Sequence, residues 1–208
     1  MKGILITMEG PDGSGKSTQI ELLREEFERL DKEVLITREP GGNAISEAIR
    51  GIILNREYEN MASETEMLLY AAARAQLVYE VIKPALLEGK VVICDRFVDS
   101  SAVYQGIGRG LGVDAVYEVN KHALSGITPD LTILLDLSAE EGIRRKKNQA
   151  ELDRMEALDI SFHRMVSEGY RELAKSDPQR ILSVDATLSV EEIHKKVMER
   201  VTALLKRG

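Results

Sequence analysis

The sequence predicts an α/β fold in which helices cover both faces of a parallel β-sheet. Five short runs have the composition of strands, and each is continuously apolar rather than alternating, which is typical of strands buried on both faces. They span residues 3–8, 34–37, 91–94, 131–137 and 180–184. Segments with apolar residues at helical spacing separate these runs. Such an alternation of strands and helices favours a parallel sheet with helical connections.

A glycine-rich loop follows the first run and carries the most specific motif. Residues 10–18 read GPDGSGKST and match the P-loop pattern G-x-x-x-x-G-K-[ST] between a strand and a helix. Gly13 and Gly15 allow backbone N–H groups to turn inward around phosphate oxygens, and the helix N-terminus adds partial positive charge. Lys16 would reach the outer phosphates, and the Ser17 hydroxyl could hold Mg2+. A glycine-rich turn without a ligand is the alternative, which the agreement of motif and context disfavours.

The composition restricts the class of protein. The chain has 208 residues, the length of one domain, and 43% hydrophobic residues, enough for a substantial core. Its net charge is −7 and it has no extended basic run, which argues against a general nucleic-acid-binding protein. The single cysteine, Cys94, excludes an internal disulfide and a cysteine-cluster metal site. No apolar run suits a signal peptide or approaches the ~18 residues of a membrane span. We therefore expect no membrane partner and a cytoplasmic location.

Charged residues follow the predicted strands at the edge where the P-loop lies. In open parallel sheets, ligands bind beyond the carboxyl ends of the strands. Arg38 follows the second strand within the segment REPGG, where a cis bond before Pro40 is allowed but not predicted. Asp95 and Arg96 follow the third strand. Each alone could be an ordinary surface charge, but beside a P-loop we expect them together to contact anions and Mg2+.

The segment from Ser63 to Leu87 is predicted to be one long helix that is apolar on more than one face. One face would pack on the sheet and the other on a second copy of the chain, which predicts a homodimer. Tyr70 and Arg74 lie one turn apart, where a ring and a guanidinium would suit a planar base. A core tyrosine and a snorkelling arginine are an equally supported alternative. Capping boxes are expected at Ser63 with Glu66, Ser138 with Glu141, and Ser189 with Glu192.

Two later segments are expected to complete the site. Residues 99–106 form a polar helical turn placed to line the same cleft, although an ordinary amphipathic helix start would look alike. Residues 142–154 hold the only dense basic cluster, including Arg144, Arg145, Lys146 and Lys147. A solvated helix end is the usual interpretation of such a run. However, transfer between two phosphates needs more positive charge than the single P-loop lysine supplies, so we favour a lid that closes over the site.

These motifs together resemble the thymidylate kinase family over nearly the whole chain. The most specific are GPDG at 10–13, REPGG at 38–42, and DRF at 95–97 followed by Ser100, Ser101, Tyr104 and Gln105; Tyr70 with Arg74 and DRME at 153–156 also fit. The resemblance implies a P-loop nucleoside-monophosphate kinase fold, as one domain over residues 1–208 with a five-stranded parallel sheet in the order 2-3-1-4-5. It also implies phosphorylation of dTMP to dTDP with ATP and Mg2+, in the synthesis of dTTP.

The resemblance further implies a role for each site residue. The P-loop would bind ATP through Gly10, Pro11, Asp12, Gly13, Ser14, Gly15, Lys16, Ser17 and Thr18. The dTMP site would comprise Asp12 at the 3′-hydroxyl, Arg38 and Arg96 at the phosphate, Tyr70 and Arg74 at thymine, Ser101 and Gln105 lining the pocket, and Tyr104 crowding C2′. Ser17 would hold Mg2+, and Asp95 would either hold Mg2+ through water or assist the attacking phosphate oxygen. The catalytic residues would be Lys16, Asp95, Arg96, Arg145 and Lys147, the last two in the lid.

The chain departs from the family pattern in two places. In the lid, Gln149 stands where related bacterial enzymes often have arginine, and Lys146 and Lys147 partly replace the expected arginines. Beside the base site, Ala73 stands where an acidic or amide residue is common. Which lid residue touches the transferred phosphoryl group therefore stays open. Two other functions compete with the leading one. A kinase for another monophosphate would differ in the pocket around the base and the sugar. The other is a regulatory P-loop switch that binds nucleotide and a protein partner. The guanine-binding motif N-K-x-D of such switches is missing, because the chain has alanine, Ala123, in place of the aspartate.

Overall fold

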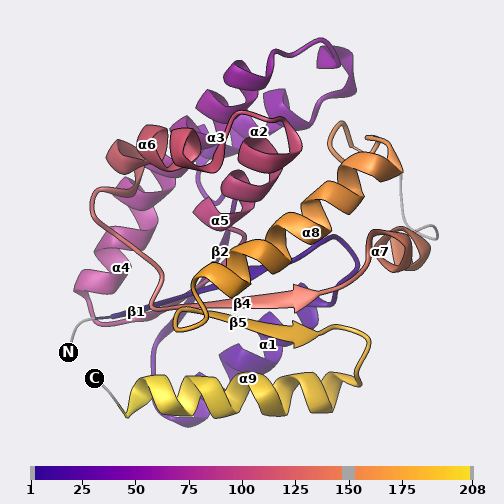
Figure 1. Ribbon diagram of the computed structural model, residues 1–208. Helices are drawn as coiled ribbons and strands as arrows, with labels where there is room; N and C mark the ends of the chain where they lie inside the picture. The colour runs from indigo at the N-terminus through magenta and orange to yellow at the C-terminus, as the bar shows by residue number, and fades with distance from the viewer. Residues whose placement is uncertain (1–2, 147–152, 207–208) are drawn as a thin grey trace.

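The computed structural model describes residues 3–146 and 153–206 (Figure 1). Five parallel strands form one sheet: β1 (Ile4–Glu9), β2 (Val34–Arg38), β3 (Val91–Asp95), β4 (Leu131–Asp136) and β5 (Ile181–Asp185). Their order is β2-β3-β1-β4-β5, and all neighbouring strands pair in parallel, which confirms the predicted fold class. β1 and β5 each begin and end one residue later than the sequence predicted.

Helices cover both faces of the sheet, as expected. α1 (Lys16–Arg29) and α9 (Val190–Leu205) pack against each other on one face, below the sheet in Figure 1. The other layer contains α3 (Ser63–Leu77), α4 (Lys83–Leu87), α6 (Val113–Leu124) and α8 (Ile160–Ser176), with α2 (Ala44–Leu54) packed on α3. Two shorter helices, α5 (Val98–Ser101) and α7 (Ala139–Lys146), begin just beyond the carboxyl ends of β3 and β4. The P-loop lies at this same edge.

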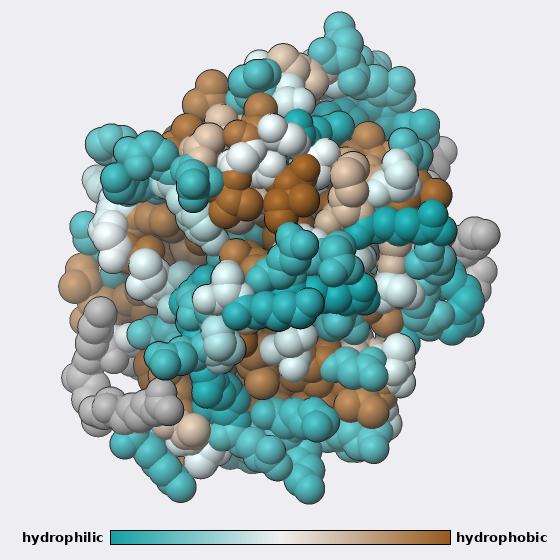
Figure 2. Space-filling model, viewed as in Figure 1, coloured by the Kyte–Doolittle hydropathy of each residue, from teal (hydrophilic) through white to brown (hydrophobic). Residues whose placement is uncertain are grey.

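The core lies on both sides of the sheet, which explains why the strands are continuously apolar. Ile6 and Ile93 are fully buried in the cluster formed with α1 and α9, whereas Leu5 and Val92 are fully buried in the cluster formed with α3 and α4. Because successive side chains of a strand point to opposite faces, both sets must be apolar. Cys94 is buried among them. Figure 2 shows the outside, where hydrophilic side chains cover much of the surface with apolar groups between them.

The predicted long helix is continuous from Ser63 to Leu87 but is not a regular α-helix throughout. α3 passes into a π-helical turn (Val78–Ile82) before α4 begins. A second π-helical turn (Ala102–Gly108) follows α5, and a 3-10 turn (Arg56–Tyr58) follows α2. Leu77 is buried against the sheet, while Tyr79 is exposed, so the helix has the two faces that the sequence predicted. Within residues 3–146 and 153–206, no helix is long and apolar enough to cross a membrane.

Only some of the capping boxes that the sequence predicts are formed in the structure. The box of Ser189 with Glu192 is complete, with both reciprocal hydrogen bonds formed. The box predicted at Ser63 is wrong, because Ala62 is the capping residue of α3 and makes no side-chain cap. Glu66, the expected partner, is instead buried in ion pairs with two arginines. Charge-assisted hydrogen bonds of this kind are stronger than the bond to a backbone N–H that a capping box offers.

Candidate active site

The P-loop connects β1 to α1 at the carboxyl edge of the sheet. Gly15 has a left-handed backbone, with φ of +95°, and caps the N-terminus of α1. Gly10 approaches β4 so closely that a Cβ atom would lie 2.5 Å from the Leu135 carbonyl oxygen. Glycine is thus required by conformation at one position and by space at the other. The loop directs the positive end of the α1 dipole toward the cavity in front of it.

Lys16 lies folded within the loop. Its ammonium group donates to the carbonyl oxygens of Gly10 and Pro11, at 3.1 and 3.2 Å, and the side chain is only 7% exposed. Burial, followed by the charge of Arg96, lowers the pKa of Lys16 to about 8. The group is therefore still largely protonated at neutral pH. Phosphate oxygens in the loop would be much stronger acceptors than the two neutral carbonyl groups.

Two cavities meet beside the P-loop. The P-loop cavity has a volume of about 450 Å³, and the second cavity, lined in part by α3, has a volume of about 110 Å³. Asp12 and Arg96 line both cavities, together with Glu39 and Arg50. A group bound at Asp12 and Arg96 is consequently accessible from either side.

The two cavities divide the predicted site residues between them. The P-loop cavity is also lined by Gly13, Gly15, Lys16, Ser17, Thr18, Arg38, Asp95 and Arg145. The second cavity is also lined by Tyr70, Arg74, Ser101, Tyr104 and Gln105. Gly10, Pro11 and Ser14 belong to the loop but line neither cavity. The structure thus brings the residues predicted for the phosphates together in one cavity and those predicted for a base and sugar in the other.

Arg96 is held at the junction of the two cavities by both its backbone and its side chain. Its φ of +67° lies in the left-handed region, which costs a non-glycine residue roughly 1–2 kcal/mol. The guanidinium donates to Asp12 Oδ1 at 2.9 Å and to the Tyr170 hydroxyl at 3.3 Å, and it lies 5.4 Å from the ring centre of Tyr104. An unfavourable backbone conformation that its surroundings maintain is characteristic of functional sites.

Asp95 and Ser17 are suitably placed for a divalent cation, since both line the P-loop cavity. Asp95 Oδ1 is buried and accepts no hydrogen bond from the described residues, and such an oxygen is costly unless a ligand completes its environment. In the described ranges, no group of three or more His, Cys, Asp or Glu side chains forms a metal site made of protein alone. Magnesium in nucleotide sites typically takes one or two protein oxygens and completes its shell with phosphates and water. The residues present therefore fit Mg2+.

Two further arginines face the P-loop cavity. Arg38, at the end of β2, pairs with Glu47 at 2.9 Å, and both side chains are exposed. Exposed pairs contribute little to stability, so Arg38 can turn toward a phosphate at small cost. Arg50, which the sequence did not reveal, lines both cavities and donates to the Pro40 carbonyl oxygen at 2.9 Å. The bond between Glu39 and Pro40 is cis.

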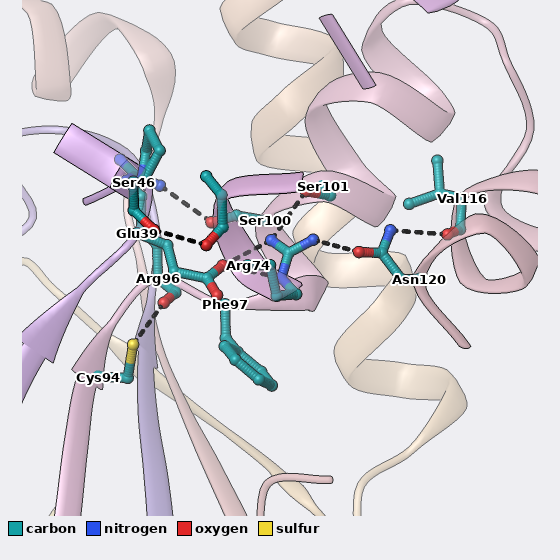
Figure 3. Close-up of polar contacts among 12 residues, drawn as sticks. Glu39, Ser46, Arg74, Cys94, Arg96, Phe97, Ser100, Ser101, Val116 and Asn120 are labelled. Carbon is teal, nitrogen blue, oxygen red and sulfur yellow. Dashed lines mark hydrogen bonds and ion pairs between the residues drawn. The ribbon is translucent and has the colours of Figure 1, made fainter. Parts of the chain in front are cut away.

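Arg74 belongs to a closed polar network behind the second cavity (Figure 3). Its Nε and Nη2 atoms donate to Glu39 Oε2 at 2.9 and 2.6 Å. Nη1 donates to Asn120 Oδ1 at 2.6 Å, and Nη2 also donates to Ser101 Oγ at 3.0 Å. The side chain is only 1% exposed, so the snorkelling alternative is wrong. These bonds leave Arg74 one N–H group without a partner among the described residues.

Part of the predicted lid is described. α7 begins after Ser138, whose hydroxyl accepts the backbone N–H of Glu141 at 3.3 Å, half of the predicted capping box. The Glu141 carboxylate pairs instead with Arg144 and Arg145. Arg145 lines the P-loop cavity and donates to a P-loop carbonyl oxygen at 3.4 Å, whereas Arg144 is exposed and does not line it. Lys147, the other predicted catalytic residue of the lid, lies outside the described residues.

Glu9, the last residue of β1, is a site residue that the sequence analysis missed. Its Oε1 accepts the backbone N–H groups of Phe97 at 2.8 Å and Ser100 at 3.3 Å. Its Oε2 accepts the hydroxyl groups of Ser100 at 2.5 Å and Tyr170 at 2.8 Å. These bonds fix the turn that carries Arg96. The sequence feature that could have revealed Glu9 is a charged residue at the end of an apolar strand, directly before the P-loop.

The Glu9 carboxyl is expected to make stability depend on pH. Burial, followed by the charge of Asp99, raises its pKa from 4.5 to about 7. A carboxyl whose pKa is higher in the folded state stabilises the fold fully below its ordinary pKa, and this contribution is lost as pH rises through the folded-state value. The loss corresponds to about 3 kcal/mol between these two pH values.

Glu9→Gln keeps the shape of the protonated carboxyl, with the amide facing the two hydroxyl groups. We therefore expect the free energy of unfolding to fall less between pH 4.5 and 7 in Glu9→Gln than in the unaltered protein, by about 3 kcal/mol. Urea titrations at several pH values measure this difference. Parallel pH profiles for the two proteins would show that Glu9 titrates normally in the fold.

Comparisons with known proteins agree with this geometry. A family model described as Thymidylate kinase matches residues 8–197. A curated thymidylate kinase from an Exiguobacterium species is 44% identical over 208 residues, covering 100% of this chain and 98% of the relative. One from Kosmotoga olearia is 46% identical over 204 residues, covering 98% of each chain. The crystal structure of thymidylate kinase from Ehrlichia chaffeensis superposes with a TM-score of 0.78 at 30% identity, covering 97% of this chain and 99% of that one.

Proposed function

Since the chain belongs to the thymidylate kinase family, we propose that it phosphorylates dTMP to dTDP with ATP as donor and Mg2+ as cofactor. The observation that carries this proposal is the meeting of two cavities at Asp12 and Arg96. One cavity has the P-loop and suits a triphosphate. The other has an aromatic ring and amide and guanidinium groups, and it suits a base and sugar. A phosphate at the junction would face the end of the triphosphate.

The proposed reaction is a direct in-line transfer. A phosphate oxygen of dTMP attacks the γ-phosphorus of ATP, the bond to the β,γ-bridging oxygen breaks, and ADP leaves with that oxygen. The protein supplies position and positive charge, because the transition state spreads negative charge over the equatorial oxygens. Arg38 and Arg96 would hold the acceptor phosphate, and Lys16 and Arg145 would neutralise the transferred group. Each of these four side chains lines the P-loop cavity.

Magnesium would be held by Asp95 and Ser17, and when bound it supplies charge neutralisation at the β- and γ-phosphates. The buried Asp95 Oδ1, which accepts no hydrogen bond from the described residues, supports this assignment. Its neighbour Arg96 points to the acceptor side of the same cavity and donates to Asp12. The start of α1 and the end of β3 would thus supply the cation ligands and the acceptor clamp at adjacent positions.

The second cavity would hold the nucleoside part of dTMP. Tyr70 would stack on thymine, Arg74 would donate its remaining N–H to a base carbonyl, and Ser101 and Gln105 would complete the pocket. Asp12 would accept from the 3′-hydroxyl of the sugar. It pairs with Arg96 at 2.9 Å in the structure, so binding would exchange part of this pair for contacts to the substrate.

Tyr104 is expected to exclude a 2′-hydroxyl. The ring lines the second cavity and packs against Phe162 and Tyr170, with ring centres 6.1 and 6.3 Å away, so it has little freedom to move aside. Tyr104→Ala should raise the ratio of kcat/KM for UMP over that for dUMP by about tenfold, as the removal of a steric clash of this size predicts.

Tyr104→Ala also removes the contact of Tyr104 with Arg96, which could lower activity in general. Such a loss affects UMP and dUMP alike and therefore cancels in the ratio. Tyr104→Phe is the matched control and should keep the original ratio, because the ring remains. If Tyr104→Ala discriminates between the two sugars as strongly as the unaltered protein, the steric explanation fails.

The experiment that tests the proposed function is ADP release with ATP and Mg2+ across a panel of nucleoside monophosphates. We expect dTMP to accelerate ATP consumption far more than AMP, GMP or CMP. Acceleration by another monophosphate alone would favour the competing kinase. Slow hydrolysis that no monophosphate changes would favour a regulatory P-loop switch.

We also propose a homodimer that forms through α2 and α3. Ile45 and Ile52 on α2, Leu68 on α3, and Tyr79 in the π-helical turn after α3 are exposed although apolar. Members of each pair lie two or three helical turns apart and so share one face. An exposed apolar surface built from adjacent helices suits a second copy of the chain. Sedimentation of the protein at micromolar concentration measures the assembly state.

The cytoplasmic location expected from the sequence stays a prediction.

A further inference from the structure

A buried carboxylate lies behind the second cavity. Glu66, on α3, is fully buried and receives three hydrogen bonds from arginines. Arg109 donates to Oε1 at 3.1 Å and to Oε2 at 2.9 Å, and Arg154 donates to Oε2 at 2.7 Å. Gln105 donates its side-chain Nε2 to Oε1 at 2.9 Å. Two guanidinium groups therefore surround one carboxylate, next to a residue of the base pocket.

The surroundings keep Glu66 ionised and immobile. Burial alone would raise the pKa of the carboxyl, but the hydrogen bonds from Arg109 and Gln105 outweigh it, and the pKa lies below its ordinary value. Both arginines have a further contact that fixes them. Arg109 lies 5.1 Å from the ring centre of Phe162, and Arg154 donates to the Ile53 carbonyl oxygen at 2.6 Å.

An ionised carboxylate determines which way the Gln105 amide points. A carboxylate has no hydrogen to donate, so only the NH2 end of the amide can face it. Rotation of the amide by half a turn would place two oxygen acceptors against each other with no hydrogen between them. The orientation therefore follows from the chemistry of the pair. Gln105 Oε1 accepts no hydrogen bond from the described residues, and it is the acceptor that this side chain offers to the second cavity.

We propose that Glu66 is a positioning residue for base selection, which holds Gln105 so that the pocket presents a fixed acceptor and selects a base with a ring N–H. Thymine and uracil carry such a group at N3, whereas N3 of cytosine is itself an acceptor. This inference rests on the proposed function, since it assigns the second cavity to a pyrimidine nucleotide. A site with a fixed buried acceptor rejects a ligand that cannot donate to it much more strongly than an apolar pocket could.

The test compares the dissociation constants of dTMP and dCMP, measured by isothermal titration. The unaltered protein is expected to bind dTMP at least about 100-fold more tightly than dCMP. In Glu66→Gln the new amide can either donate or accept, so Gln105 is free to rotate. We expect the ratio of the two dissociation constants to fall at least about tenfold, chiefly because dTMP binding weakens.

A double-mutant cycle separates positioning from general damage. In a Gln105→Leu background there is no amide to orient, so Glu66→Gln should leave the ratio unchanged. Asp99→Asn is a matched control for the loss of a buried charge. Asp99 is only 1% exposed and pairs with Arg180 at 2.6 Å, as Glu66 pairs with its arginines. This variant should lose stability but keep the preference for dTMP.

Glu66→Gln leaves the buried Arg154 and the half-buried Arg109 without their carboxylate and could prevent folding. In that case Glu66→Gln with Arg109→Met replaces it, because this pair of changes preserves the net charge of the cluster. The same fall in the ratio is expected. An unchanged ratio in a folded protein overturns the role of Glu66. Failure of the unaltered protein to bind dTMP would overturn the proposed function instead, so the two failures are distinguishable.

Discussion

Arg96→Ala is expected to lower kcat by about 1,000-fold while the dissociation constant of ATP changes little. Of the predicted catalytic residues that the structure describes, Arg96 alone lines both cavities, and it donates to Asp12 at the point where the acceptor phosphate would lie. The loss of one preorganised donor to the reacting groups typically costs about 10²- to 10³-fold in kcat, and misplacement of the attacking phosphate adds to this loss. ATP would bind mainly through the P-loop, which the substitution leaves in place.

Steady-state kinetics with dTMP, and titration with an ATP analogue that is not hydrolysed, measure the two effects. Arg96→Lys keeps the charge but not the planar fork, so we expect an intermediate loss. Arg144→Ala is the control for removal of a nearby arginine, because Arg144 is exposed and does not line the P-loop cavity. Turnover close to normal in Arg96→Ala would remove Arg96 from the mechanism.

Lys16→Met is expected to lower kcat/KM for ATP by about 1,000-fold and to leave dTMP binding nearly unchanged. The methionine side chain keeps most of the packing of Lys16 but has no charge for the β- and γ-phosphates. Removal of one preorganised donor from a transition state typically costs 10²- to 10³-fold, and here a ground-state contact to ATP is lost as well. The second cavity does not include Lys16, so the acceptor site should be intact.

Titration of Lys16→Met with dTMP separates the two sites, and thermal unfolding shows whether the P-loop is still folded. Lys16 donates to the carbonyl oxygens of Gly10 and Pro11, and the loss of these bonds should lower stability only modestly. Equal loss of ATP and dTMP binding would contradict the assignment of the two cavities to two different nucleotides.

The fold and the P-loop cavity could be predicted because their signals are local. Five apolar runs predicted the strands, and the structure shifts their bounds by about one residue. The position of a residue at the carboxyl end of a parallel strand was enough to bring Arg38, Asp95 and the P-loop together. Such placement depends on the backbone, which the sequence pattern specifies well.

The buried ion pairs could not be predicted, because their partners are far apart in the sequence. Arg74 was expected to contact a base, but its contacts to Glu39 and Asn120 depend on the packing of three separate elements. Glu66 matched a capping pattern, yet it pairs with Arg109 and Arg154. A local pattern cannot show which of several possible partners a charged side chain takes, since tertiary packing decides it.

The lid shows an intermediate case. Its charge cluster was visible in the sequence, but successive residues such as Arg144 and Arg145 point in different directions from a helix. Only the structure distinguishes Arg145, which lines the P-loop cavity, from Arg144, which is exposed. The role of Glu9 was not visible in the sequence at all. Glu9 lies directly before the P-loop motif, and its role depends on contacts with Phe97 and Tyr170, which are distant in the sequence.

The central claim is that two nucleotides meet at Arg96, and a crystal structure with dTMP, Mg2+ and an ATP analogue that is not hydrolysed tests it most directly. We predict that the dTMP phosphate contacts Arg38 and Arg96, that its base lies against Tyr70, and that the γ-phosphate of the analogue faces it from the P-loop. A dTMP molecule bound elsewhere, or a phosphate that Arg96 does not contact, would contradict the account.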